Sequence, residues 1–168
     1  LISHRCHGAI ALRIGDVPFK APSTPAHSSW LGTDWASDAE QTARALGEET
    51  VDRLVVDHYG LDRRWELTLR PACQRLMVID DLADRLHDCD LLLDQNLGRT
   101  KRDSDCLVAP VTKTLIGPKH ALLRPEFAQW RSYSLARRNH SQLKNLLITM
   151  GGVDEGNFTG QVPDALNV

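Results

Sequence analysis

Three groups of polar residues in this sequence each follow a short apolar run. They are Asp57-His58-Tyr59, Asp80-Asp81 and Asp94-Gln95-Asn96. Their carboxylates, amides, phenol and imidazole can hydrogen-bond to a sugar or a phosphate, and an imidazole titrates in the range where a general base works. In parallel sheets the carboxyl ends of neighbouring strands lie along one edge, and ligands bind there. We therefore predict that the three groups face a common cleft.

Each group also has a purely structural interpretation. An Asp at a strand end can cap the turn that follows it, and for any single group capping is the favoured interpretation. The adjacent carboxylates of Asp80 and Asp81 usually point to opposite faces of a strand. No neighbouring His or third carboxylate completes an oxygen-rich shell, so we predict no metal site. A lone His beside an acid is more often structural, so spacing alone gives His58 no catalytic role.

A fourth candidate is the stretch TMGGVDEGN, from Thr149 to Asn157. A strand that runs into Gly151-Gly152 and then into a helix can offer backbone N–H groups to a phosphate. The stretch lacks the full GxGxxG and GxxxxGK[ST] patterns. A tight strand-to-helix turn without a ligand is therefore an equally good interpretation.

The elements that must position these groups follow from the apolar pattern. The runs that predict buried strands are Leu54–Val56, Leu76–Ile79, Leu91–Leu93, Leu143–Thr149 and the shorter Thr114–Ile116. Helices are predicted over Trp35–Leu46 and over Asp62–Leu69, which Pro71 closes. Strands separated by helices imply parallel pairing, so we predict an α/β doubly wound, Rossmann-like sheet. The polar segment Arg131–Gln142 is interpreted as an inter-domain linker or, alternatively, as a surface helix.

Composition narrows the class of protein. The chain has 168 residues, 42% hydrophobic and 25% charged, which is typical of a globular protein of one domain, or of one domain and part of another. The net charge of −2 argues against nucleic acid or an anionic membrane surface as the main partner. The four cysteines show no metal-ligand spacing and are interpreted as reduced thiols, which favours a cytoplasmic protein. Leu1 looks like the tail of a strand already under way, so we expect a fragment that is open at both ends.

Four longer motifs carry a family resemblance. They are LVVDHYGLDRRWE, VIDDLADRLHDCDLLLDQN, LIGPKHALLRPEF and LLITMGGVDEGN, in this order. Over Trp30 to Thr159 the chain resembles the PseG family, the nucleotide-sugar hydrolases of pseudaminic acid biosynthesis. The resemblance implies two Rossmann-like domains in the GT-B arrangement, with a cleft between them. Residues 1–130 would form most of the N-terminal domain, 131–142 a linker, and 143–168 the first strand, turn and helix of the C-terminal, UDP-binding domain.

The resemblance also implies an activity. The family cleaves the anomeric C–O bond of UDP-2,4-diacetamido-2,4,6-trideoxy-β-L-altropyranose with water, and it inverts the anomeric carbon without a glycosyl-enzyme intermediate. It requires no metal or cofactor. Its partner is a small-molecule UDP-sugar, not a nucleic acid or a membrane. The product feeds the synthesis of a nonulosonic acid that decorates flagellin.

The resemblance assigns roles to particular residues. Tyr59 and Asp57 match the sugar side of the family's site, and Tyr59 is the best candidate to contact the reacting sugar or the attacking water. Further substrate-binding candidates are His58, Asp80, Asp81, Asp94, Gln95, Asn96, Arg124, Gly151, Gly152 and Asp154. The family's presumed general-base His lies in a Gly-rich loop that would precede Leu1, so we expect the 168 residues alone to be inactive.

Two other classes of function stay open at this point. The chain could belong to a related GT-B glycosyltransferase or an acetyltransferase fusion, or it could be a non-catalytic remnant that binds a nucleotide sugar. The sequence does not fix the sugar epimer, because contacts to the acetamido groups decide it, nor does it fix the oligomeric state.

Overall fold

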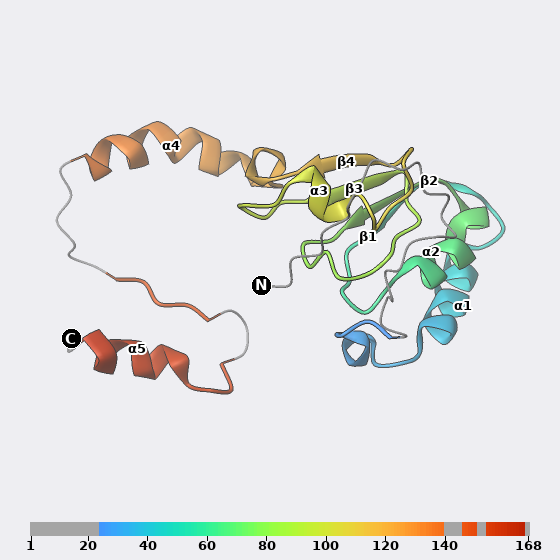
Figure 1. Ribbon diagram of the computed structural model, residues 1–168, viewed down its shortest axis with the longest axis horizontal. Helices are drawn as coiled ribbons and strands as arrows, with labels where there is room; N and C mark the ends of the chain where they lie inside the picture. The colour runs from blue at the N-terminus through green and yellow to red at the C-terminus, as the bar shows by residue number, and fades with distance from the viewer. Residues whose placement is uncertain (1–23, 140–145, 151–153, 167–168) are drawn as a thin grey trace. The chain divides into compact units, whose positions relative to one another are not determined.

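A computed structural model of the chain describes residues 24–139, 146–150 and 154–166. The chain divides into two units, Leu1–Leu122 and Leu123–Val168. The first unit contains a four-stranded sheet, whose elements Figure 1 labels in chain order.

The strands of this sheet are all parallel, and they pair in the order of the chain. They are β1 (Val51–Val56), β2 (Cys73–Ile79), β3 (Leu91–Asp94) and β4 (Lys113–Ile116). The order β1-β2-β3-β4 aligns Val56 with Val78, Ile79 with Leu93, and Asp94 with Ile116. The predicted parallel α/β sheet is therefore confirmed, and each predicted strand in this unit lies within an observed one.

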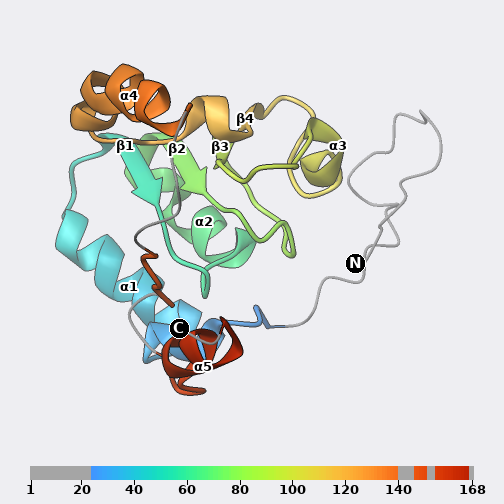
Figure 2. The ribbon, with the colours of Figure 1, turned by 90° about the vertical axis from the view of Figure 1, so that its left-hand side faces the viewer.

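Two helices cover one side of this sheet (Figure 2). Helix α1 spans Trp35–Leu46 and is capped by Asp34, whose side chain accepts hydrogen bonds from the backbone N–H groups of Ala36 and Ser37. Helix α2 spans Arg63–Leu69 and is capped by Asp62, whose side chain accepts a hydrogen bond from the N–H of Arg64. Both segments agree with the predicted helices. The indole Nε1 of Trp65 donates to Asp38 Oδ1 at 2.7 Å, so one hydrogen bond links the two helices.

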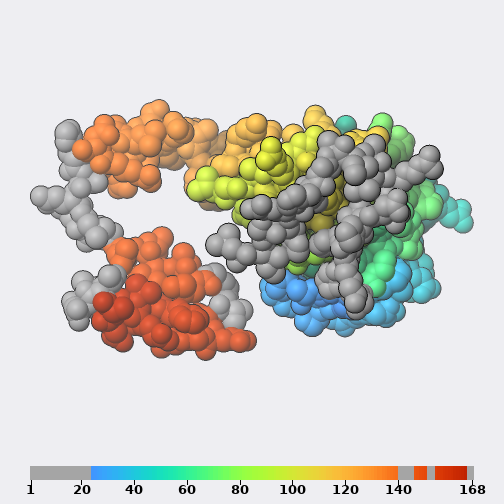
Figure 3. Space-filling model, viewed as in Figure 1, coloured from blue at the N-terminus to red at the C-terminus, as the bar shows by residue number. Residues whose placement is uncertain are grey.

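The hydrophobic core lies between these helices and the sheet. Its buried members are Ala39, Val56, Leu61, Trp65, Leu69, Cys73, Leu76, Val78, Cys89 and Leu92. The short 3-10 helix η1 (Ser28–Leu31) lies beside α1, and the two form a continuous surface, drawn in blue and cyan in Figure 3. Val55 is 55% exposed, so the prediction that Leu54–Val56 is buried is wrong for this residue of β1.

The connections between strands depart from a strict alternation of strand and helix. Between β1 and β2, α2 is followed by the 3-10 helix η2 (Arg70–Ala72). Between β3 and β4 lies a single turn of helix, α3 (Lys101–Ser104). Residues 80–90, between β2 and β3, form an irregular loop without a helix. We call this segment the β2–β3 loop, and the site depends on it.

Beyond β4 come the 3-10 helix η3 (Pro118–His120) and then the second unit. This unit contains α4 (Pro125–Arg138) and α5 (Phe158–Leu166). Residues 131–138 of the predicted linker are thus helical, as part of α4. Leu146–Thr149, the described part of the predicted strand Leu143–Thr149, is not a strand. A strand requires a paired neighbour, and the described residues provide none for this segment. The predicted domain boundaries stay predictions.

The cysteines differ from the expectation at one position. Cys73 and Cys89 are buried free thiols, whereas Cys106 is disulfide-bonded, so the prediction of a reduced thiol is wrong for Cys106. Cys6 lies outside the described residues. Within the described part of the chain, no helix combines the length and the hydropathy that a membrane span requires.

Candidate functional site

The loop after β1 is shaped by a tight turn around His58. The imidazole Nδ1 accepts a hydrogen bond from the backbone N–H of Gly60 at 3.0 Å, and the carbonyl of His58 accepts one from Leu61. A Cβ on Gly60 would lie 3.0 Å from both the His27 carbonyl oxygen and His58 Cε1, so a larger residue there would require these neighbours to shift. The imidazole therefore shapes the turn, and Asp57 and Tyr59 are the two side chains of this loop that line the cavity described below.

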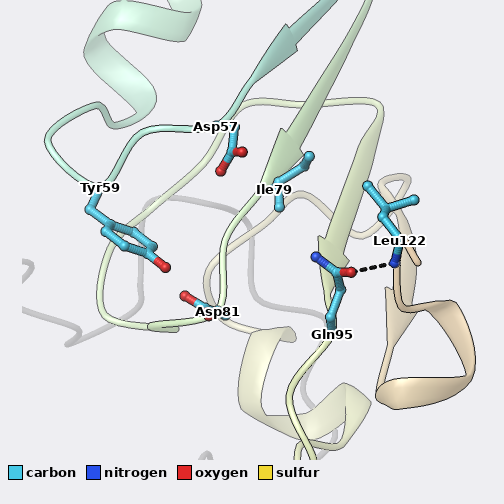
Figure 4. A pocket seen from close by; sticks show the side chains of 6 residues that line it. All are labelled: Asp57, Tyr59, Ile79, Asp81, Gln95 and Leu122. Carbon is cyan, nitrogen blue, oxygen red and sulfur yellow. Dashed lines mark hydrogen bonds between the residues drawn. The ribbon is translucent and has the colours of Figure 1, made fainter. Parts of the chain in front are cut away.

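The two acids after β2 have different environments. Asp80 is buried, and its carboxylate accepts hydrogen bonds from the backbone N–H groups of Leu82 and Ala83 and pairs with Arg85. Asp81 instead points towards the Tyr59 hydroxyl (Figure 4). Both residues lie beyond the end of β2, and the turn that Asp80 caps separates the two environments. The structure thus brings Asp81 into the site, whereas Asp80 lies behind it.

The residues at the end of β3 also divide between structural and cavity-lining positions. Asp94 caps a turn by accepting a hydrogen bond from the N–H of Asn96 at 2.9 Å, and burial raises its pKa. Asn96 donates its amide to the Asp81 carbonyl at 2.7 Å, so it holds the β2–β3 loop. Gln95 Oε1 accepts from the N–H of Leu122, which leaves the amide nitrogen of Gln95 as a donor for a ligand.

These elements enclose a cavity of about 260 Å³ at the carboxyl edge of the sheet. Its lining comes from the ends of three strands and from the segment after β4: Asp57, Tyr59, Ile79, Asp81, Gln95 and Leu122 (Figure 4). The predicted convergence of the three polar groups is therefore observed, with at least one member of each group in the lining. Ile79 and Leu122 were not predicted, because apolar side chains at a strand end carry no chemical signal of a site.

The electrostatics of the cavity keep Tyr59 protonated. Its interaction with the Asp81 carboxylate is the main cause that raises its pKa to about 12, followed by burial and by the charges of Asp57 and Asp80. The phenol is thus a hydrogen-bond donor near neutral pH and is not suited to act as a base. Asp81 Oδ1 is buried and accepts no hydrogen bond from the described residues. A donor group on a ligand would satisfy this oxygen.

A buried ionic network lies behind the cavity. His87 Nδ1 lies 2.6 Å from Glu66 Oε1, and His87 Nε2 lies 3.5 Å from Asp80 Oδ2. The other carboxylate oxygen of Asp80, Oδ1, lies 2.8 Å from Arg85 Nη1. Burial alone would lower the pKa of His87, but Asp80 and Glu66 raise it to about 9. Burial would raise the pKa of Asp80, but His87 and Arg85 lower it to about 2. We call Glu66, Asp80, Arg85 and His87 the ionic network.

The remaining predicted residues lie in or beside the second unit. Arg124 is exposed, and its guanidinium carbon lies 5.7 Å from the centre of the Phe127 ring. Asp154 accepts hydrogen bonds from the N–H groups of Phe158 and Thr159 at the start of α5. Gly151 and Gly152 lie outside the described residues. Within the described ranges, no group of three His, Cys, Asp or Glu side chains is arranged to hold a metal ion.

Comparison with known proteins finds two that are similar to this chain. The chain is 31% identical over 123 residues to the UDP-2,4-diacetamido-2,4,6-trideoxy-β-L-altropyranose hydrolase of Campylobacter jejuni, a match that covers 72% of this chain and 42% of the hydrolase. The chain is a distant relative of this hydrolase.

A second match is to an uncharacterised protein of Methanocaldococcus jannaschii, 27% identical over 133 residues, which covers 77% of this chain and 27% of that protein. The chain therefore spans less than half of the length of the curated relatives it matches. No protein-family model matches it.

Proposed function

We propose that this chain is part of a nucleotide-sugar hydrolase, and that the cavity binds the sugar of a UDP-sugar. The observation that supports the proposal most directly is the polar lining. Two carboxylates, a protonated phenol and an amide face a cavity of about 260 Å³. Cavities that enclose a whole drug-sized ligand measure roughly 300–1,000 Å³, so this one suits one part of a UDP-sugar and not all of it.

The charges favour the sugar over the diphosphate. Asp57 and Asp81 repel a phosphate at close range, and no Lys or Arg is among the lining residues. Sugar hydroxyls and acetamido N–H groups are hydrogen-bond donors, and the unsatisfied Oδ1 of Asp81 is an acceptor for such a group. The diphosphate would then lie outside the cavity.

The apolar lining fits the sugar that the Campylobacter jejuni relative acts on. According to its name, that sugar is a 2,4-diacetamido-2,4,6-trideoxy pyranose, which carries three methyl groups. Ile79 and Leu122 provide apolar surface within the cavity. Because a site that hydrogen-bonds N–H groups rejects analogues without them, we expect a diacetamido sugar to bind more tightly than one with hydroxyls at the same carbons.

The reaction would be a displacement at the anomeric carbon. The oxygen of water forms a bond to this carbon while the bond to the phosphate oxygen breaks, UDP leaves with the electron pair, and the proton that the water loses passes to the solvent or to the released phosphate. Tyr59 remains protonated and holds the sugar or the water by a hydrogen bond, and the carboxylate of Asp57 orients the water or the sugar. Both side chains would act at the reacting centre.

The test measures the release of UDP from the UDP-diacetamido sugar by the full-length protein that carries this sequence. We expect release without an acceptor, and we expect Tyr59→Phe to slow it about 10²-fold or more, as for other donors of this kind, whereas Tyr133→Phe on α4 has no effect. Turnover only with an added acceptor would instead indicate a glycosyltransferase. Binding of UDP without turnover would indicate a non-catalytic binding protein.

A further inference from the structure

Arg85 connects two loops that line the cavity. It lies in the β2–β3 loop, its side chain is 4% exposed, and it lines no part of the cavity itself. The β1–α2 loop carries Tyr59, and the β2–β3 loop carries Asp81. These are the two side chains whose contact raises the pKa of the phenol.

The guanidinium makes contacts on both sides. Towards the β1–α2 loop, Nε donates to the Leu61 carbonyl at 2.7 Å, and Nη2 lies 3.5 Å from the carbonyl of His58. These two carbonyls flank Tyr59 in the sequence. Towards its own loop, Nη1 lies 2.8 Å from Asp80 Oδ1 and 2.9 Å from Asp84 Oδ1. The guanidinium of Arg85 thus joins the backbone on either side of Tyr59 to the carboxylate of Asp80, the residue that precedes Asp81.

We propose that Arg85 is a positioning residue that holds the Tyr59 hydroxyl against the carboxylate of Asp81. A rigid fork of donors can bind two carbonyls and a carboxylate at fixed angles, whereas the ammonium of lysine is a single flexible point charge. The β2–β3 loop has no helix or strand to fix it. Asn96 and Arg99 hold the Asp81 carbonyl, and Arg85 holds the neighbouring Asp80 together with the backbone around Tyr59. The proposal holds whichever ligand the cavity binds.

The ionisation of Tyr59 reports this geometry without any substrate. The chain has two tyrosines, Tyr59 and Tyr133, so Tyr133→Phe leaves a single phenol to follow by tyrosinate absorbance. In this background we expect Tyr59 to titrate well above its ordinary value of 10.0. Arg85→Lys should lower the midpoint by about 1 pH unit or more, because the phenol loses the carboxylate that disfavours its ionisation.

The matched control is Arg75→Lys. Arg75 also pairs with a carboxylate, that of Asp90, but it lies on β2 away from the cavity. This variant should leave the midpoint unchanged. A folded Arg85→Lys protein with the same Tyr59 midpoint as Arg75→Lys would overturn the proposal, because a purely structural arginine predicts that result.

A second variant decides the question if Arg85→Lys fails to fold. Asp84 binds Arg85, but its side chain is 38% exposed, and the pair between Arg85 and Asp80 remains when it is removed. Asp84→Ala should therefore fold and shift the Tyr59 midpoint downwards by a smaller amount. An unchanged midpoint in Asp84→Ala would also contradict the proposal. Neither measurement depends on hydrolysis, so a failure here is distinct from a failure of the proposed function.

Discussion

The buried imidazole of His87 should make the stability of the protein fall as the pH rises from neutral. His87 is protonated between Glu66 and Asp80, and its pKa is raised from 6.5 to about 9. Between these two values the folded protein holds a proton that the unfolded chain has released. The free energy of unfolding therefore decreases with pH in this window, and the contribution is fully present below 6.5 and lost above about 9.

The magnitude follows from the shift. One pKa unit corresponds to about 1.4 kcal/mol, so the rise of His87 from 6.5 to about 9 corresponds to about 3 kcal/mol of stability. Typical domains unfold with about 5–15 kcal/mol. The loss would therefore be a large part of the total and easy to measure.

The assay is denaturant unfolding at several pH values from 6 to 9, followed by tryptophan fluorescence. Trp65 is buried next to Glu66 on α2 and reports this unit. Wild type is compared with His87→Gln, so that the titration of all other groups cancels. The stability difference between the two should shrink by about 3 kcal/mol across the window. His120→Gln, on η3, should keep the wild-type slope. If His87→Gln and wild type lose stability in parallel, the imidazole is not charged in the folded protein and the reasoning is refuted.

Three further predictions concern the same unit. The pKa of Asp80 is lowered from 3.8 to about 2, which corresponds to about 2 kcal/mol of the free energy of unfolding. This stabilisation is present above pH 3.8 and is lost as the pH falls through about 2. In equilibrium unfolding at acid pH, Asp80→Asn should therefore lose less stability with falling pH than the wild type. Gly60→Ala should destabilise by roughly 1–3 kcal/mol in thermal unfolding, because the new Cβ would lie 3.0 Å from the His27 carbonyl oxygen and force the backbone there to shift. A change below about 0.5 kcal/mol would count against that contact. Leu69→Ala on the buried face of α2 should cost about 2–5 kcal/mol, whereas Leu67→Ala, 48% exposed on the same helix, should cost much less; equal costs would contradict the packing described here.

The alternation of apolar runs and polar residues was enough to predict the sheet and the edge of it at which the cavity lies. The apolar runs in β1 to β4 are bounded by polar residues, and the rule for parallel strands then places Asp57, Asp81 and Gln95 at one edge.

The ionic network could not be predicted in this way. Arg85 and His87 lie in an irregular loop, where no periodicity indicates which side chain is buried. Their partner Glu66 lies in α2, and a charged residue within a helix is usually solvated. The sequence contains one indication that Glu66 is buried. It precedes Leu69 by three positions and follows Trp65, which places it on the apolar face of the helix.

The sequence also contains cues for helix α4, although the segment is polar in composition. Pro125 occupies the first turn, Glu126 follows it, and Arg137 lies in the last turn, as the helix dipole favours. Phe127 and Trp130 recur at the spacing of one helical face. These cues identify a helix, although the segment buries none of its residues.

The order of the strands has a consequence for how the protein folds. Each strand pairs with the one that follows it in the chain, so every pairing joins segments that are close in sequence. Short separations favour rapid folding, and during synthesis each strand can add to an edge that has already formed. The cavity would then assemble in the same sequence, from Tyr59 to Asp81 to Gln95, and Leu122 would complete its wall last. A ligand that contacts all four residues can bind only after this step.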